Sequence, residues 1–408
     1  CTLHPSLLVE PDHKGASSMV TLLPIPCALV PADAPAAHRL CSPNYDEFQS
    51  DREIVDLLCV QPDSVLQVTM PHCNVEGGGG FPEEGSRAAL AVARECMDSL
   101  RGGPLTREVR DVIFIYEIQD PLRRGTRQMG LGGMAKVAEI RTEATPDAPI
   151  IRNEGIREEK AKGRADLIQA TRSFVGIVNN AINDESREMA ESMASYAAHR
   201  PCDYHARDEY SNVHRIWLIH DPGEQAEFFE LLSREPCAYV ADGNHRSAAA
   251  ALLGSGEFLC VFFPARTMGL APYNRLVDAA VLSSGELETA LGRSFVVERW
   301  NEGGAYQPES VHEIGMYVRN AWYRLRPRED TFDPTNAAES IDSNIVQRLI
   351  FHDVFGIADA RDKRLTFVGG NRDAAYLQDQ VDAGTYAYAV TLAPVTMDQF
   401  ISVCDQNR

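Results

Sequence analysis

The chain has 408 residues, of which 44% are hydrophobic and 24% are charged, a composition typical of a folded protein with two or three domains. Its 59 acidic and 39 basic residues give a net charge of −20, which disfavours a general nucleic-acid binder or a protein of anionic membrane surfaces. No apolar run approaches the ~20 residues of a membrane helix, and Asp12, His13 and Lys14 interrupt any signal-peptide pattern. The ten cysteines show neither a Cys-x-x-Cys pair nor a zinc-binding spacing, which favours free thiols and a cytoplasmic protein.

Residues 1–20 read as a loose leader, and a start at Cys1 instead of Met indicates a fragment or a processed form. The glycine run at 77–80 has no lysine after it, so it predicts a flexible loop and excludes a Walker-type phosphate loop. Apolar and β-branched runs predict strands, in chain order, at 21–26, 64–69, 111–116, 136–140, 214–219, 237–241, 259–263, 295–297, 316–318, 322–325, 367–370 and 387–392. Helical composition predicts helices at 51–58, 83–100, 165–172, 185–199, 223–235, 247–253, 341–354 and 396–404.

The most informative stretch is 237–252, CAYVADGNHRSAAAAL, which predicts a strand, a polar turn and the first turn of a helix. The N–H groups and the positive dipole end of such a helix attract anions. Gly243 allows a ligand to approach the backbone, while Arg246 and His245 add donors suited to phosphate. We therefore expect an anion site at this turn.

Two further roles are expected within the same turn. Asp242 offers a carboxylate that could hold Mg²⁺ or orient a hydroxyl group. A purely structural alternative stays open, in which Arg246 is salt-bridged and Ser247 caps the helix. The concentration of polar groups in one turn favours the anion site.

The alternation of strands and helices over 213–263 predicts an α/β unit within a mixed α/β protein. We expect an N-terminal α/β region at 21–205, a nucleotide-binding core at 206–300 and a C-terminal α/β region at 301–408.

Residues 240–248 resemble the Asp-Gly-His-His-Arg signature of the uncharacterised DUF1015 family. Asn244 and Asn153 depart from the family pattern, because histidine is usual at the first position and frequent at the second. Other segments resemble the family in the same order along the chain: 42–48, 153–154, 208–217, 272–275 and 367–370. The resemblance therefore covers most of the chain.

The family is similar, through its central turn, to ParB and sulfiredoxin folds and to free-serine kinases. This resemblance implies that Gly243, Asn244, His245, Arg246 and Ser247 bind a nucleotide, with catalytic roles for Asp242 and His245. It also implies a catalytic glutamate at the start of the helix before the motif strand. Glu224, which follows Asp221-Pro222, is the best match, although a helix dipole alone also favours an acid in the first turn.

We therefore expect a small-molecule kinase that transfers a phosphoryl group from ADP or ATP, with Mg²⁺, to free serine or a similar hydroxylated metabolite. The alternative is a non-catalytic, ParB-like nucleotide sensor. Neither requires nucleic acid or a membrane. A homodimer is one option, because the sequence does not fix the oligomeric state.

His72 and Cys73 are adjacent and could form a catalytic Cys–His pair, although a loop histidine beside a free thiol is the simpler interpretation. Sulfiredoxin-type chemistry needs a cysteine in the central turn, and the asparagine at 244 argues against it.

Overall fold

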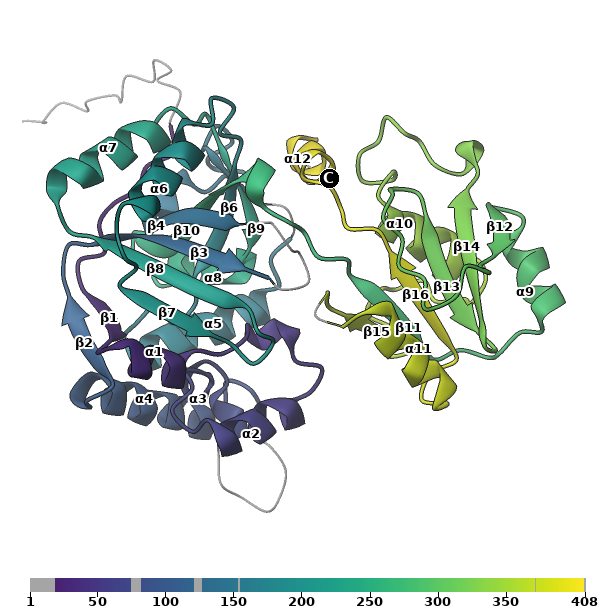
Figure 1. Ribbon diagram of the computed structural model, residues 1–408, viewed down its shortest axis with the longest axis horizontal. Helices are drawn as coiled ribbons and strands as arrows, with labels where there is room; N and C mark the ends of the chain where they lie inside the picture. The colour runs from purple at the N-terminus through teal and green to yellow at the C-terminus, as the bar shows by residue number, and fades with distance from the viewer. Residues whose placement is uncertain (1–18, 75–81, 121–126, 153–154, 371, 407–408) are drawn as a thin grey trace, which may run out of the picture.

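The computed structural model describes residues 19–74, 82–120, 127–152, 155–370 and 372–406. Most of the expected leader, the glycine run at 77–80 and the Asn153-Glu154 pair lie outside these ranges. The described chain forms two bodies, each built around one β-sheet (Figure 1). The protein is thus a mixed α/β protein, as the sequence predicts. Within the described ranges, no helix combines the length and apolar character needed to cross a membrane.

The first body contains an eight-stranded sheet with the order β5-β9-β6-β10-β4-β3-β8-β7. Two neighbouring pairs, β5–β9 and β6–β10, are parallel, and the other pairs are antiparallel. The strands span Ile113–Gln119 (β3), Gln128–Lys136 (β4), Ile150–Arg152 (β5), Val178–Ile182 (β6), Tyr204–Arg207 (β7), Val213–Ile219 (β8), Ala238–Asp242 (β9) and Glu257–Pro264 (β10). A separate ribbon joins Ala28–Pro31 (β1) to Thr106–Val109 (β2).

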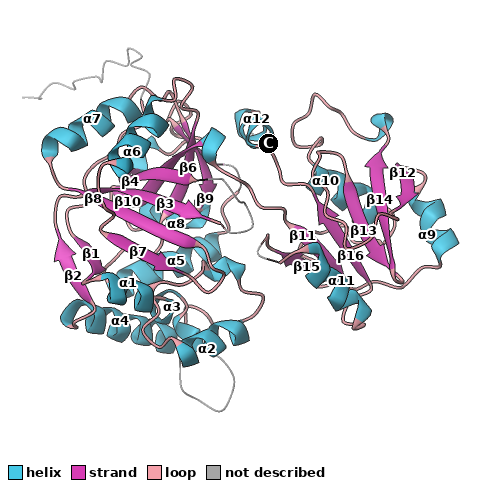
Figure 2. Cartoon of the chain, in the orientation of Figure 1, coloured by secondary structure: helices cyan, strands magenta, loops and turns pink. Residues whose placement is uncertain are grey.

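Helices cover this sheet (Figure 2). The large apolar core joins one face of the sheet to side chains of α6, α7 and α8. A smaller cluster lies between α2, α3 and the 3₁₀ turn Pro71–Asn74. The helices of this body are Ala34–Leu40 (α1), Asp51–Val60 (α2), Leu66–Thr69 (α3), Arg87–Gly102 (α4), Glu158–Thr171 (α5), Glu188–Ala198 (α6), Pro222–Leu232 (α7) and Asn244–Leu252 (α8).

The second body contains a six-stranded, fully antiparallel sheet with the order β12-β14-β13-β16-β11-β15. Its strands are Asn274–Val277 (β11), Phe295–Arg299 (β12), Ile314–Val318 (β13), Ala321–Pro327 (β14), Leu365–Val368 (β15) and Tyr388–Leu392 (β16). Its helices are Ser284–Leu291 (α9), Asp342–Val346 (α10) and Ala374–Asp382 (α11), and α10 continues as a wider helical turn over Gln347–His352.

The last helix, Met397–Asp405 (α12), returns to the first body (Figure 1). Cys404 of α12 belongs to the same apolar cluster as Ile151 and Ala181 of the first sheet. The Tyr239 hydroxyl also donates a hydrogen bond to Asp405 at 2.8 Å. The chain therefore connects the two bodies twice, once after β10 and once before α12.

Three predicted strands are wrong. The run 21–26 forms only isolated β-bridges, at Leu23 and Ile25. The run 64–69 forms the short helix α3, and 136–140 forms the end of β4 and a 3₁₀ turn. The strand β4 was missed because Gly130, Gly132 and Gly133 interrupt its apolar pattern. A Cβ atom at Gly132 would lie 2.1 Å from the Phe114 ring, so these glycines let neighbouring elements pack closely.

The strands predicted at 316–318 and 322–325 are confirmed, and they form a hairpin that turns at Arg319-Asn320. Both residues have positive φ, 49° and 60°, as the favoured two-residue hairpin turn requires.

The expected core at 206–300 does not coincide with one sheet. Its first strands, β8 to β10, pair with strands from the region before residue 206, whereas β11 and β12 belong to the second sheet. The expected boundaries fall within the sheets because strand pairing joins residues that are distant in sequence.

Candidate functional site

The central turn has the predicted strand–turn–helix geometry. Strand β9 ends at Asp242, and α8 begins at Asn244. Between them, Gly243 has φ +104°, a conformation that other residues rarely adopt, and a Cβ there would lie 3.1 Å from the Val178 Cα. Glycine is therefore required both for the backbone conformation and for the close approach of the turn to β6.

Arg246 closes this turn. Its guanidinium donates hydrogen bonds to the Ile177 carbonyl oxygen and, at 2.5 Å, to the Asp242 carboxylate. The Arg246 side chain is only 12% exposed, whereas that of Asp242 is 42% exposed. The salt-bridged arrangement that the sequence left open is therefore present, and the accessible group at the turn is the carboxylate.

The other predicted residues of the turn point in different directions. His245 Nε2 accepts a hydrogen bond from the Arg157 backbone N–H at 3.1 Å, which brings the start of α5 to the turn. Asn244 is buried, with 3% of its surface exposed. The fully buried Ser247 donates its hydroxyl to the Asn244 carbonyl oxygen at 2.9 Å, so this hydroxyl faces the helix backbone.

Two polar residues that the sequence did not single out lie next to β9, two residues before it ends at Asp242. Asn180 on β6 and Arg152 on β5 both flank Val240 on β9 in the strand register, so the three side chains share one face of the sheet. Asn180 is 0% exposed, and within the described chain neither atom of its amide group has a hydrogen-bond partner. The Nε of Arg152 is likewise buried without a described partner, and burial lowers the pKa of this guanidinium.

Such groups are rare because a buried polar atom without a partner costs about 1–3 kcal/mol. A water molecule or a polar ligand beside these side chains would satisfy them. No sequence pattern marks Asn180, which lies between Val178 and Ile182 in a buried strand and looks like an ordinary core position.

Glu224 is not brought to the turn. It lies in the first turn of α7, where the Tyr196 hydroxyl donates to it at 3.3 Å and the Arg200 guanidinium forms an ion pair with it. A catalytic role for Glu224 at the turn would require β8 and β9 to be neighbouring strands, but four strands separate them. Five strand spacings correspond to about 24 Å across a flat sheet.

The family-like segments nevertheless meet near the turn. Tyr45 of the segment 42–48 lines a small cavity together with Arg246 and with Arg164 of α5, whose guanidinium lies 4.4 Å from the Tyr45 ring centroid. This cavity has room for about one water molecule, so a larger ligand would have to lie over the exposed side of the turn.

The same segment reaches the loop 208–210. Phe48 packs against Tyr210 with a ring separation of 6.1 Å, and Arg372 of the second body lies 5.9 Å above the Tyr210 ring. Arg372 also pairs with Glu53 of α2 at 3.6 Å. These contacts place the segments 42–48 and 208–210 between the central turn and the second body.

Next to the loop 208–210, three side chains are linked by hydrogen bonds. The Tyr116 hydroxyl lies 2.7 Å from His214 Nδ1, and His214 Nε2 lies 3.2 Å from the Asp208 carboxylate. Burial raises the pKa of the Tyr116 phenol. Burial alone would also raise the pKa of Asp208, but hydrogen bonds from His214 and Asn212 lower it, so the carboxylate stays ionised.

Together, the fold and the site define a two-sheet mixed α/β protein with a polar, glycine-dependent turn at one rim of its larger sheet. The DUF1015 family, described as a protein of unknown function, matches residues 22–349. The chain therefore belongs to the DUF1015 family, as its motifs predict. No functionally curated protein matches the sequence.

The solved structures that align with the chain share only 8% sequence identity with it. A free serine kinase in complex with AMP aligns over 68% of this chain and 83% of its own, with a TM-score of 0.35, and a mutant of that kinase in complex with ADP gives the same values. A conserved hypothetical protein from Pyrococcus furiosus aligns over 67% and 85%, with a TM-score of 0.33. A C-terminally truncated SbnI from Staphylococcus aureus aligns over 68% and 78%, with a TM-score of 0.35. At these values the likeness assigns no activity.

Proposed function

We propose that the protein binds a nucleotide at the turn from Asp242 to Arg246 and transfers a phosphoryl group from ADP or ATP to the hydroxyl group of a small metabolite such as free serine. The observation that carries this proposal is the buried, unpartnered Asn180 amide, which lies opposite Val240, two residues before Asp242. It supports a polar ligand close to the end of β9.

The exposed parts of the turn suit a polyphosphate. Asp242 uses one carboxylate oxygen for Arg246 and is 42% exposed, so its second oxygen could hold Mg²⁺, which commonly binds through one carboxylate and the substrate phosphates. When bound, Mg²⁺ would neutralise phosphate charge. The first turn of α8 and the Arg246 guanidinium behind it add positive potential at the same place.

We also assign His245 to this ligand. Because its Nε2 accepts from the Arg157 N–H, a neutral ring carries its proton on Nδ1 and can donate there.

In this proposal no residue of α7 is the general base. Glu224→Gln should therefore leave the turnover rate unchanged. A decrease in this rate of about 10²–10⁴-fold would show that Glu224 is the base after all.

A non-catalytic nucleotide sensor is the second candidate. The observation in its favour is that the four strands between β8 and β9 separate the predicted base from the predicted phosphate site.

The first test is thermal denaturation of the full chain with ADP, ATP and CTP, each with Mg²⁺. A ligand at 100 times its Kd stabilises the folded state by about 2.7 kcal/mol, which a melting curve detects. We expect Asn180→Leu to abolish the increase in melting temperature that the nucleotide causes. Asn274→Asp, in the second sheet, is the control, and a folded Asn274→Asp variant should keep this increase. If no nucleotide raises the melting temperature of the wild type, the proposal is wrong.

The second test separates the two candidates. A nucleotide-by-acceptor screen, followed by phosphorus NMR, should show a new phosphate ester with serine or another hydroxyl compound. Binding in the first test without any transfer in this screen would favour the sensor.

A further inference from the structure

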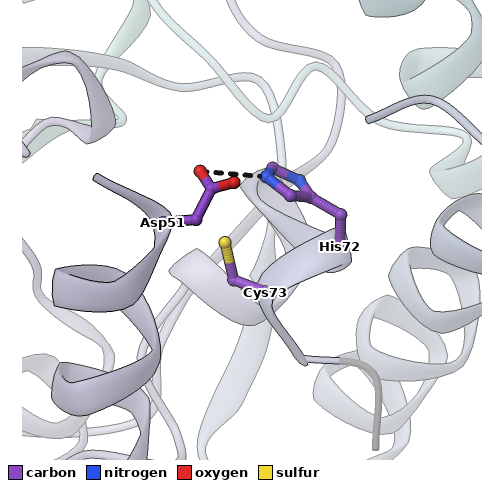
Figure 3. Close-up of side chains that lie close together, drawn as sticks. All are labelled: Asp51, His72 and Cys73. Atoms are coloured by element: carbon purple, nitrogen blue, oxygen red, sulfur yellow. Dashed lines mark ion pairs between the residues drawn. The ribbon is translucent and has the colours of Figure 1, made fainter. Parts of the chain in front are cut away.

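We infer that Asp51, His72 and Cys73 form a binding site for Zn²⁺ that is separate from the central turn. One ligand atom from each residue lies within 4.8 Å of the other two. Figure 3 shows the His72 ring and the Cys73 sulfur directed toward the Asp51 carboxylate. Within the described residues this is the one group of at least three such side chains that could hold a metal ion.

The spacing suits zinc. Tetrahedral zinc with bonds of about 2.0–2.3 Å places its ligand atoms about 3.4–3.6 Å apart. His72 Nε2 and Asp51 Oδ1 are already 3.3 Å apart. Small rotations of the Asp51 and Cys73 side chains would therefore complete three bonds without a change in the backbone.

The His72 ring presents its Nε2 to the cluster. The ring is 4% exposed, and its Nε2 faces the Asp51 carboxylate. This buried nitrogen is therefore the imidazole atom that would bind the metal.

The charges favour a cation over a catalytic Cys–His pair. The Asp51 and Glu84 carboxylates make the surroundings of the Cys73 thiol electronegative. A reactive cysteine needs an electropositive environment, which is the opposite of this one. The same carboxylates would instead attract a divalent metal ion, which binds the sulfur as a thiolate.

The ligand set identifies the metal and the type of site. A thiolate, an imidazole and a carboxylate together suit Zn²⁺ better than Mg²⁺ or Ca²⁺, which prefer oxygen ligands alone. Three protein ligands leave a fourth position for water, the pattern of a zinc site that is open to a substrate. Asp51 is 46% exposed, so solvent reaches this side.

Zinc at this site would also join two elements of the first body. Asp51 begins α2, whereas His72 and Cys73 belong to the 3₁₀ turn Pro71–Asn74. Cys73 packs in the apolar cluster of α2 and α3, and Tyr45 and Phe48 pack against that cluster. Bound zinc would therefore tie the start of α2 to the turn that supports the segment 42–48.

Titration of the chelator-treated full chain with Zn²⁺ alone tests the inference. We expect one ion per chain with a Kd of micromolar or below, and a higher melting temperature with Zn²⁺. Co²⁺ in place of Zn²⁺ should give a thiolate-to-metal charge-transfer band in the near ultraviolet. Absence of stoichiometric binding, or of this band, would overturn the proposal.

Variants locate the site. Cys73→Ser should remove the cobalt band, and Asp51→Asn should weaken binding by about tenfold or more, by analogy with the loss of metal-site partners. Cys59→Ser is the matched control, because Cys59 is an exposed thiol on α2, the helix that begins with Asp51. This substitution should leave zinc binding unchanged. If Cys73→Ser fails to fold, Asp51→Asn and the wild-type cobalt spectrum still decide the question. Unchanged affinity in Asp51→Asn would contradict the assignment.

Discussion

Asn180 in the first sheet and Asn274 in the second are both fully buried, yet their amide groups have different surroundings. Asn274 Nδ2 donates to the Gln307 side-chain oxygen at 3.2 Å, and its Oδ1 accepts from the Leu392 N–H at 3.0 Å. Neither amide atom of Asn180 has a partner in the described chain. A satisfied buried amide fixes strand positions, whereas an unsatisfied one marks a place where a ligand or water completes the structure.

The largest predicted effect is a difference in stability between two variants in which one of these asparagines is replaced by leucine. Asn274→Leu should lower the free energy of unfolding by about 3 kcal/mol, because it leaves the Leu392 N–H and the Gln307 amide buried without their partner. Asn180→Leu should stay within about 1 kcal/mol of the wild type, since it removes a group that is already unsatisfied. Urea denaturation measures both. Equal losses would show that the two asparagines play the same structural role.

The next effect concerns the backbone of the central turn. Gly243→Ala should cost about 2 kcal/mol, because it adds a Cβ close to Val178 Cα in a conformation that disfavours side chains. Gly254→Ala is the control, since Gly254 also has positive φ, +63°, but a Cβ there meets nothing within 4 Å. Its expected cost is about 1 kcal/mol. The difference between the two melting temperatures would vanish if the contact with β6 did not matter.

The two bodies should also respond oppositely to pH. In the second body, burial raises the pKa of Asp342 to about 6, although its carboxylate accepts hydrogen bonds from the His312 N–H. Because the folded pKa exceeds the unfolded value of about 3.9, this stabilisation is present below pH 4 and is lost as the pH rises through about 6. Asp208 in the first body has a lowered pKa, so its contribution is present above pH 4 and is lost as the pH falls further.

Asp342→Asn should therefore flatten the decrease in stability between about pH 4 and 6, an effect on the order of 1–2 kcal/mol. Asp208→Asn should instead flatten the loss of stability at acid pH. Chemical denaturation at a series of pH values measures both slopes. A wild-type slope near zero between pH 4 and 6, unchanged in Asp342→Asn, would contradict the raised pKa.

The smallest predicted effect lies between the bodies. The Arg372–Glu53 pair is about one-third exposed at each side chain, so its coupling energy should be below about 1 kcal/mol and should weaken with salt. A double-mutant cycle with Glu53→Gln and Arg372→Gln measures this energy. A value well above this limit would mean that the ion pair holds the two bodies together.

Most individual elements could be predicted from the sequence, because they depend on neighbouring residues. The hairpin at Arg319-Asn320 is an example, since local turn chemistry defines it. Strand β4 could not be recognised, since its glycines make sense only beside the Phe114 ring and the Val261 side chain, which come from other strands. The helix α3 was mistaken for a strand because four residues are too few to show a period.

The candidate sites divide in the same way. The sequence by itself determined the strand, the glycine turn and the helix around Asp242 to Arg246, because Gly243 and the alanine-rich run after it act locally. The tertiary structure alone decided that Asn180 lies opposite Val240 of β9 and that four strands separate β9 from β8, the strand that leads to α7. It also brought Asp51 to His72 and Cys73. Strand pairing and helix packing join residues that are far apart in the chain, and no local pattern records which partners they choose.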